Sequence, residues 1–261
     1  MTVRDAVALT AAALLLAACG GGSPDDARGG ATAGAETASG RTGEVVTVLA
    51  AASLTEPFTR LAADYEGAHP GTTVRVSFGS STTLARQVAE GADADLLATA
   101  GTTALDRLGD VTPIATTTIA RNTLEIATPP DDAAGVHSLA DLARPDVDVV
   151  LCAASVPCGA AADEVLARAG VAAHVVSREV DVRSTVAKVA LGEADAAVVY
   201  HSDVASSGGR VRGVDIPATL NTTLTYPLVR FGDGAAATAF AAYLVGPEGR
   251  AALADAGFLG P

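Results

Sequence analysis

The sequence has no tryptophan and one methionine, and aromatic residues make up only 3% of its 261 residues. Hydrophobic residues still account for 49%, so alanine, valine and leucine must fill the interior. A chain of this length and composition can build one large domain, or two lobes of ordinary size, around a substantial core.

Basic residues are also scarce, since 17 lysines and arginines stand against 30 aspartates and glutamates, for a formal net charge of −13. A nucleic-acid surface needs a basic patch to displace counterions, and binding to anionic lipid needs similar charge, so both are disfavoured. A small anion is compatible with this charge, because a recessed cluster of oriented N–H donors can override the net charge locally.

The N-terminal segment has the features of an export signal. Arg4 precedes an apolar run over residues 6–18, which is shorter than the roughly 20 residues that a membrane-spanning helix needs. We therefore favour a signal peptide over residues 1–18 to a transmembrane anchor. The run ends in LAACG at residues 16–20, which resembles a bacterial lipobox and implies that Cys19 carries a lipid.

Glycine, alanine, serine and threonine dominate the residues that follow. Such a composition cannot bury a core, so residues 19–43 are predicted to be the lipidated cysteine and a flexible tether. The folded part should start near Glu44. No later apolar stretch is long enough to cross a membrane.

Two further cysteines, Cys152 and Cys158, remain as a pair. In an exported protein such a pair is typical of a disulfide, which across so short a loop would stabilise the fold by roughly 2 kcal/mol. Two free thiols or a metal pair are the alternatives, but no histidine or cysteine stands beside them. The four histidines are scattered without helical pairing, so they do not indicate a metal site: His69, His137, His174 and His201.

Apolar, β-rich runs alternate with helical patterns along the folded part. Strands are predicted over residues 45–50, 73–78, 94–99, 147–152, 174–180 and 194–200, and helices over 54–68, 83–90, 160–169, 184–191, 235–244 and 248–256. This alternation predicts an α/β protein of βαβ units on mostly parallel sheets, which bind ligands at the carboxyl ends of their strands.

The two halves of the folded part share a plan of strand, short polar turn and helix. Residues 123–127 are a candidate first crossing between lobes, and residues 225–230 a candidate return. The predicted division is a first lobe of residues 44–122 plus 226–261 and a second lobe of residues 123–225. The last two helices would then pack on the first lobe.

Four loops connect a strand to the start of a helix, at residues 50–56, 77–84, 156–161 and 181–184. A helix N-terminus presents unpaired N–H groups and a partial positive charge, which make it a ready anion site. Each loop also has a structural interpretation when taken alone. Ser53 and Glu56 fit a Ser-x-x-Glu capping box, and the hydroxyl run at residues 80–83 fits a cap and a turn. Tyr200 alone would be a core residue with its hydroxyl at the surface.

In their order along the chain and in their amino-acid sequences, these loops resemble those of the periplasmic molybdate-binding protein family of class II solute-binding proteins. The motifs are AAASL (50–54), SFGSSTTLARQ (77–87), GADADL (91–96), VPCG (156–159), DVR (181–183), VVYHSD (198–203) and YP (226–227). They cover essentially all of the folded part. The resemblance implies the type II periplasmic-binding-protein fold, with two lobes, each a mostly parallel sheet flanked by helices, and a cleft between them.

The ligand pattern of that family implies an oxyanion site made of donors from both lobes. Ser53 and Ser81 would offer hydroxyl and backbone N–H groups, Cys158 and Val182 backbone N–H groups, and Tyr200 a hydroxyl. Many members have alanine where this chain has Cys158; a main-chain donor tolerates that change, although a disulfide could alter the loop geometry. A contribution from Ser80 or Thr82 stays open.

A site of hydroxyls and amides suits a fully ionised tetrahedral oxyanion, because the site offers only donors and the ion only acceptors. Protonated phosphate would need a buried acceptor, and in these loops only Asp181, whose direction is open, could provide one. Sulfate differs from molybdate in size, whereas tungstate barely does. Arg183 is better explained as a surface residue, solvated or paired with Asp181, than as a charge partner of the ligand.

The resemblance thus implies the substrate-binding component of an ABC importer, neither an enzyme nor a cofactor-dependent protein. It would be a monomer, held at the outer face of the membrane by its lipid alone, that captures molybdate or tungstate and delivers it to the permease and its ATPase. A sulfate- or phosphate-binding protein of the same fold is the nearest alternative. A secreted serine hydrolase is another, although the sequence lacks a Gly-x-Ser-x-Gly elbow and the four loops contain no histidine. A structural lipoprotein would leave the four donor-rich helix starts unexplained.

Overall fold

The computed structural model of the protein describes residues 43–261. The strands are β1 (Glu44–Ala51), β2 (Thr72–Gly79), β3 (Leu96–Ala98), β4 (Ala115–Thr128), β5 (Val149–Cys152), β6 (Val175–Glu179), β7 (Ala196–Tyr200), β8 (Arg212–Asp215) and β9 (Thr223–Arg230). The α-helices are α1 (Thr55–Ala68), α2 (Ser81–Ala89), α3 (Pro157–Ala169), α4 (Val182–Ala190), α5 (His201–Ala205), α6 (Ala235–Val245) and α7 (Pro247–Asp255). Short 3₁₀ helices are η1 (Ala52–Leu54), η2 (Thr103–Leu108) and η3 (Leu139–Ala143).

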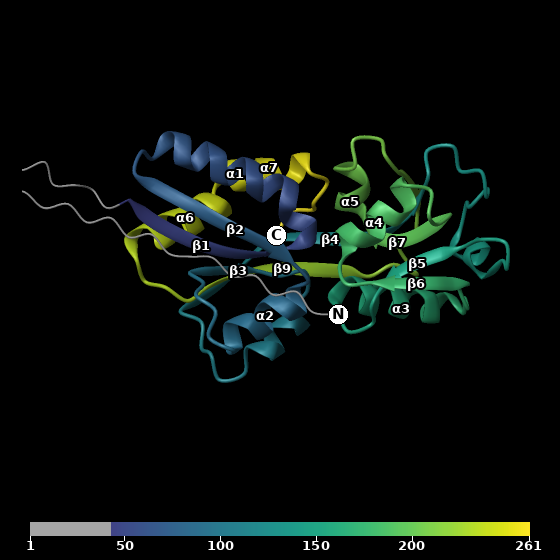
Figure 1. Ribbon diagram of the computed structural model, residues 1–261, viewed down its shortest axis with the longest axis horizontal. Helices are drawn as coiled ribbons and strands as arrows, with labels where there is room; N and C mark the ends of the chain where they lie inside the picture. The colour runs from purple at the N-terminus through teal and green to yellow at the C-terminus, as the bar shows by residue number, and fades with distance from the viewer. Residues whose placement is uncertain (1–42) are drawn as a thin grey trace, which may run out of the picture. The chain divides into compact units, whose positions relative to one another are not determined.

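Two groups of parallel strands are joined by a long antiparallel pair. The strand order is β2-β1-β3-β9-β4-β7-β5-β6, and β8 pairs with β4 off this path. We call β1–β3 with α1, α2, α6 and α7 the first lobe, and β5–β7 with α3, α4 and α5 the second lobe (Figure 1). β1 is parallel to β2 and β3, and β5 is parallel to β6 and β7. The predicted α/β class with mostly parallel lobes is therefore confirmed.

The connecting strands β4 and β9 form an antiparallel pair that joins the lobes: β9 pairs with β3 of the first lobe, and β4 pairs with β7 of the second. β4 pairs with β9 from Ala115 to Thr123 and then continues beside β7, where Leu124 faces Tyr200. The predicted crossings, residues 123–127 and 225–230, lie within these two strands. Both lobes are thus held by backbone hydrogen bonds to the same pair of strands.

Side chains of β1 alternate between the two faces of the first lobe's sheet, as a strand requires. Val46 and Val48 are fully buried in the cluster that includes Phe58 of α1 and Phe240 of α6, whereas Leu49 belongs to the cluster that includes α2. α6 contacts β1, and α7 contacts α1. The C-terminal helices thus cover the first lobe, as expected.

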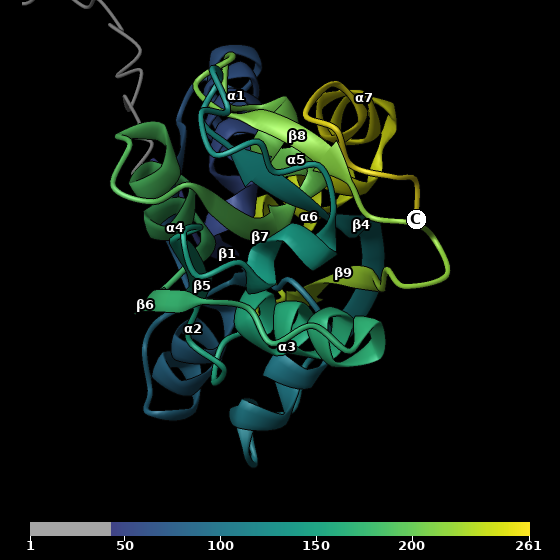
Figure 2. The same ribbon diagram turned by 90° about the vertical axis from the view of Figure 1, so that its right-hand side faces the viewer.

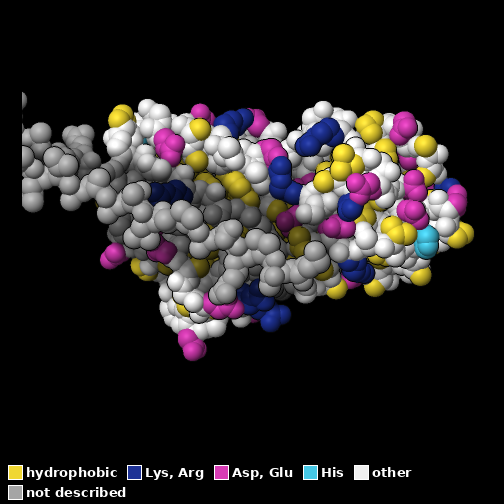
Figure 3. All heavy atoms as spheres, viewed as in Figure 1, with side chains coloured by type: hydrophobic (Ala, Val, Ile, Leu, Met, Phe, Trp, Pro, Cys, Tyr) yellow, Lys and Arg dark blue, Asp and Glu magenta, His cyan; other side chains and the backbone are white. Residues whose placement is uncertain are grey.

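In the second lobe, α3 lies on one face of the sheet and α4 and α5 lie on the other (Figures 1 and 2). On the face in Figure 3, the described lysine and arginine side chains lie scattered among acidic ones. No helix within residues 43–261 combines the length and apolar character needed to span a membrane.

The sequence located most helices and parallel strands, but of the longest strand, β4, it identified only residues 123–127. Three helices begin two or three residues earlier than predicted, at Ser81, Pro157 and Val182. The five-residue helix α5, the strand β8 and the 3₁₀ helices were not predicted, because such short segments carry little periodicity and, unlike β3 and β5, do not coincide with a continuous apolar run.

Candidate ligand-binding site

The four strand-to-helix loops converge on one cavity between the lobes. Its volume is about 20 Å³, far below the 300–1,000 Å³ or so of a site for a drug-sized organic ligand. The first lobe contributes Ala51, Ala52, Ser53, Gly79, Ser80, Ser81 and Ala100, and the second contributes Val156, Pro157, Cys158, Asp181, Val182 and Tyr200. The structure thus brings together all five residues that the sequence singled out.

Ser53 lies in η1, the single turn inserted between β1 and α1, and is only 3% exposed. Its Oγ is 3.0 Å from the hydroxyl of Tyr226. The predicted capping box is wrong, because η1 shifts the start of α1 to Thr55, whose N-cap is Leu54, without a side-chain cap. The position after β1 aims Ser53 at the cavity instead.

Two serines open α2 beside Ser53. The backbone N–H of Ala100 donates to Ser81 Oγ at 2.9 Å, which leaves the hydroxyl hydrogen of Ser81 available to another acceptor. Ser80 is the N-cap, and its buried Oγ has no hydrogen-bond partner among the described residues. Thr82 instead donates to the carbonyl of Ser155 in the second lobe at 3.1 Å. Ser80 therefore joins the candidate donors, and the Thr82 side chain contacts the opposite lobe.

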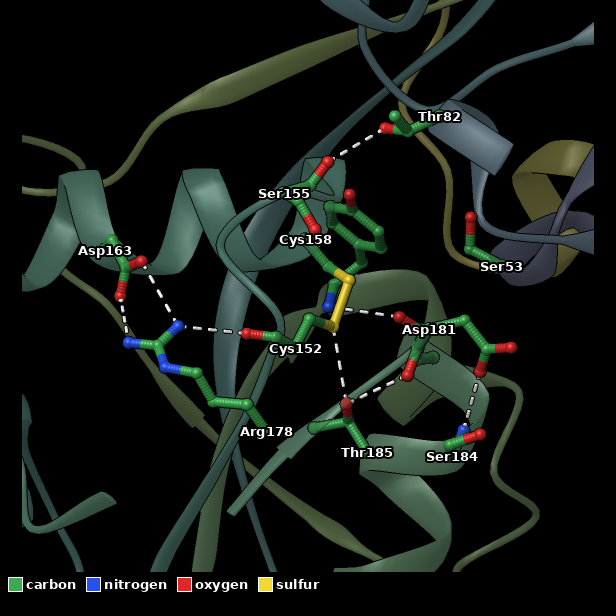
Figure 4. The surroundings of a disulfide bond; sticks show 12 residues. Ser53, Thr82, Cys152, Ser155, Cys158, Asp163, Arg178, Asp181, Ser184 and Thr185 are labelled. Carbon is green, nitrogen blue, oxygen red and sulfur yellow. Dashed lines mark hydrogen bonds and ion pairs between the residues drawn. A yellow bond between two sulfur atoms is a disulfide. The ribbon is translucent and has the colours of Figure 1, made fainter. Parts of the chain in front are cut away.

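The second lobe presents two helix N-termini to the cavity. Val182 is the first residue of α4, and its N–H belongs to the first turn, which has no intrahelical acceptor. The Asp181 side chain caps this helix, since its Oδ1 accepts the N–H of Ser184 at 2.9 Å (Figure 4). The direction of Asp181, open from the sequence, is thus toward its own helix.

Cys158 lies in the first turn of α3, in a disulfide with Cys152 at the end of β5 (Figure 4). Their Cα atoms are 5.7 Å apart, and both residues are buried. A Cβ at Gly159 would lie 2.0 Å from the carbonyl oxygen of Ala153, so only glycine permits this close approach of helix and strand. The disulfide and this contact together fix the start of α3 beside the cavity.

Tyr200 ends β7 and is 2% exposed, and it lines the cavity, as expected of a ligand donor rather than of a core residue with its hydroxyl at the surface. Within residues 43–261 only three buried side-chain N or O atoms lack a hydrogen-bond partner, and two of them, Ser80 Oγ and Tyr200 OH, belong to residues that line this cavity. Burial raises the pKa of Tyr200 well above its ordinary value, so the hydroxyl keeps its hydrogen. Asp203 accepts the N–H of Tyr200 at 3.1 Å, and burial raises the pKa of Asp203 to about 8.

No lysine, arginine or histidine is among the described residues that line the cavity. Arg183 was expected to be solvated or paired with Asp181, and the second expectation is wrong. It forms an ion pair with Glu56 of the first lobe at 2.5 Å. Both side chains are about two-fifths exposed, so this pair lies at the rim of the cleft. No group of three or more histidine, cysteine or acidic side chains suited to a metal ion occurs in the described part of the chain.

Two buried residues lie behind the cavity, and the sequence predicted no role for either of them. Tyr226 of β9 contacts Ser53, and Asn122 of β4 lies behind it, both with no exposed surface. Tyr226 stood only within a family motif, and Asn122 within an unremarkable strand. A buried asparagine in an apolar strand needs partners, and that is the signal that could have drawn attention to it.

Comparisons with known proteins identify the family to which the chain belongs. Residues 46–259 match the family described as bacterial extracellular solute-binding protein. The molybdate-binding protein ModA of Mycobacterium tuberculosis is 34% identical over 221 residues, which cover 83% of this chain and 85% of that protein. A putative ABC transporter substrate-binding lipoprotein of Bacillus subtilis, YvgL, is 30% identical over 190 residues, or 70% of this chain and 73% of that one.

Among solved structures, the periplasmic molybdate-binding protein of Azotobacter vinelandii superposes with a TM-score of 0.72 at 21% identity, covering 83% of this chain and 99% of that one. This likeness confirms the predicted two-lobed periplasmic-binding-protein fold. The family match covers nearly all described residues, and the relatives match over most of their own length. The chain belongs to the family of bacterial extracellular solute-binding proteins.

Proposed function

We propose that this protein is the substrate-binding component of an ABC importer, and that it captures molybdate, or tungstate, and delivers it to the permease and its ATPase. The observation that carries the proposal is the pair of buried hydroxyls without partners, Ser80 Oγ in the first lobe and Tyr200 OH in the second. A buried hydroxyl without a partner is destabilising unless a ligand pairs with it. Relatives of this chain include molybdate-binding proteins.

The chemistry of the cavity suits an oxyanion with no proton. Ser53, Ser81 and Tyr200 offer hydroxyls, and the first turns that contain Cys158 and Val182 offer backbone N–H groups. Each hydrogen bond to a charged acceptor contributes about 1.5–3 kcal/mol, so several together support tight binding without a cationic side chain. Asp181 is the single carboxylate among the described residues that line the cavity, and its Oδ1 already accepts the N–H of Ser184, so a protonated phosphate would have at most the other Asp181 oxygen as a carboxylate acceptor.

Closure of the two lobes over the ligand is part of the proposal. The two lobes, residues 44–122 plus 226–261 and residues 123–225, would hinge about β4 and β9. The ion pair of Arg183 with Glu56 and the hydrogen bond from Thr82 to Ser155 connect the lobes and would help to hold the closed form.

Export and anchoring complete the proposal. The signal peptide (1–18), the lipidated Cys19 and the tether (19–43) lie outside the described residues, apart from residue 43 at the tether's end. The likeness to a putative substrate-binding lipoprotein supports a lipid anchor at the outer face of the membrane. The protein would act there as a monomer and without enzymatic activity.

Titration calorimetry with molybdate, tungstate, sulfate and phosphate tests the ligand. Molybdate and tungstate should bind with sub-micromolar Kd, and sulfate and phosphate much more weakly. Sulfate binding as tight as molybdate binding would contradict the molybdate assignment and favour a sulfate-binding protein of the same fold. Hydrolysis of an activated ester together with labelling by a serine-reactive probe would support the hydrolase instead.

A further inference from the structure

A line of three buried side chains leads from the connecting strands to the cavity. Asn122 lies on β4, Tyr226 on β9 and Ser53 just after β1, and none is more than 3% exposed. Asn122 Nδ2 is 3.4 Å from the Tyr226 hydroxyl, which is 3.0 Å from Ser53 Oγ. Asn122 and Tyr226 do not line the cavity; Tyr226 reaches it through its hydrogen bond with Ser53, and its ring also packs edge-on against that of Tyr200, with 6.1 Å between the ring centroids.

The amide of Asn122 has a fixed direction. The backbone N–H of Thr123 donates to Asn122 Oδ1 at 3.0 Å, so the oxygen lies on that side and the amide nitrogen on the other. The nitrogen donates to Ser202 Oγ at 2.7 Å as well as toward Tyr226. Because an amide nitrogen only donates, Asn122 offers no acceptor to the phenol of Tyr226.

Ser53 Oγ is therefore the one acceptor within hydrogen-bonding distance of the Tyr226 hydroxyl among the described residues; the Tyr200 hydroxyl lies near enough to influence the pKa of Tyr226 but forms no hydrogen bond with it by distance and angle. Burial raises the pKa of Tyr226, so the hydroxyl hydrogen is held throughout the physiological range. A buried hydroxyl that leaves its hydrogen unpaired is destabilising, so Tyr226 donates and Ser53 accepts. The hydrogen of Ser53 then remains for a group in the cavity.

Ser81 has the same arrangement by another route. The N–H of Ala100 donates to Ser81 Oγ at 2.9 Å, which again leaves the serine hydrogen for the cavity. Ser53 and Ser81 thus each already accept a hydrogen bond from the protein. At these two positions a ligand oxygen that carries a proton would meet a hydroxyl hydrogen, whereas Ser80 Oγ and Tyr200 OH, which have no partner among the described residues, are free to donate or to accept.

We propose that Tyr226, oriented by Asn122, is a positioning residue that makes the Ser53 hydroxyl a one-way donor and so selects oxyanions without a proton. The inference rests on the proposed function and assigns the discrimination to two residues outside the ligand's reach. Without the phenol, Ser53 could rotate and accept a hydrogen bond from a protonated ligand.

Molybdate and arsenate are suitable probes, because both are tetrahedral dianions of similar size at pH 8 and only arsenate keeps a proton. Calorimetry should show that Tyr226→Phe weakens molybdate binding about tenfold and arsenate binding threefold or less, so that the ratio of the two affinities falls. Tyr243→Phe, a phenol-to-phenyl change on α6 away from the cavity, is the matched control and should leave both affinities unchanged.

A double-mutant cycle distinguishes positioning from general structure. If Tyr226 acts through Ser53, Tyr226→Phe should have little further effect on molybdate binding in a Ser53→Ala background. Additive effects, or equal weakening of molybdate and arsenate by Tyr226→Phe, would overturn the inference and leave the proposed function standing. Failure of the unmodified protein to bind molybdate would instead defeat the proposed function, and the inference with it.

A second variant covers the case in which Tyr226→Phe does not fold, as judged by circular dichroism. Asn122→Asp places an acceptor where the amide nitrogen donates, so the phenol hydrogen can turn away from Ser53. A buried carboxylate weakens both dianions alike, so the ratio of affinities isolates the change of direction. The ratio should fall as in Tyr226→Phe, and an unchanged ratio would count against the inference.

Discussion

The hydroxyl of Tyr200 should serve ligand binding and contribute nothing to the fold. It is buried, yet it has no hydrogen-bond partner in residues 43–261. Tyr200→Phe therefore removes no hydrogen bond from the protein itself. It should remove one charge-assisted hydrogen bond to the ligand, which contributes about 1.5–3 kcal/mol and corresponds to about a 10- to 150-fold rise in Kd.

Calorimetry and thermal unfolding measure the two halves of this prediction. Without ligand, the free energy of unfolding of Tyr200→Phe should equal or exceed that of the unmodified protein. With molybdate at fixed concentration, the increase in the free energy of unfolding caused by the ligand should be smaller in Tyr200→Phe, as its higher Kd requires. Tyr243→Phe is the control, since Tyr243 lies on α6 and does not line the cavity. An unchanged molybdate Kd, or a ligand-free protein destabilised by 1 kcal/mol or more, would refute the reasoning.

Three further outcomes are expected. Replacing Cys152 and Cys158 together by serine should lower the free energy of unfolding by roughly 2 kcal/mol and weaken molybdate binding. Reducing agent should produce both effects in the unmodified protein. A melting temperature that does not change with reducing agent would contradict this. Arg183→Ala should weaken binding by at most about fivefold, because its ion pair with Glu56 is partly exposed, and the effect should shrink at high salt; a larger, salt-independent loss would mean that Arg183 contacts the ligand. Burial raises the pKa of Asp203 to about 8, so between about pH 4 and 8 the folded protein keeps a proton that the unfolded chain has lost, and the free energy of unfolding should fall as the pH rises through this range. Denaturant unfolding should show a shallower fall of that free energy with pH in Asp203→Asn. An identical pH dependence in the two proteins would show that the carboxyl titrates normally.

The amino-acid sequence determined the features that depend on neighbours along the chain. Alternating apolar runs and helical patterns located the main strands and helices, because periodicity and helix-start signals act over a few residues. The positions of Ser53, Ser81, Cys158 and Val182 after their strands followed from the same local order, and parallel strands bring such loops to one edge. Local signals also misled, since Ser53 and Glu56 have the spacing of a capping box that η1 displaces.

Only the tertiary structure decided which polar groups pair and which stay free. Ser53 and Tyr226 are 173 positions apart, and Arg183 and Glu56 are 127 apart, so no local pattern could reveal either contact. The unpaired state of the Tyr200 hydroxyl depends on every chain segment packed around it. A local pattern places a donor on an element, but the packing of distant elements determines whether that donor is already used or is left for a ligand.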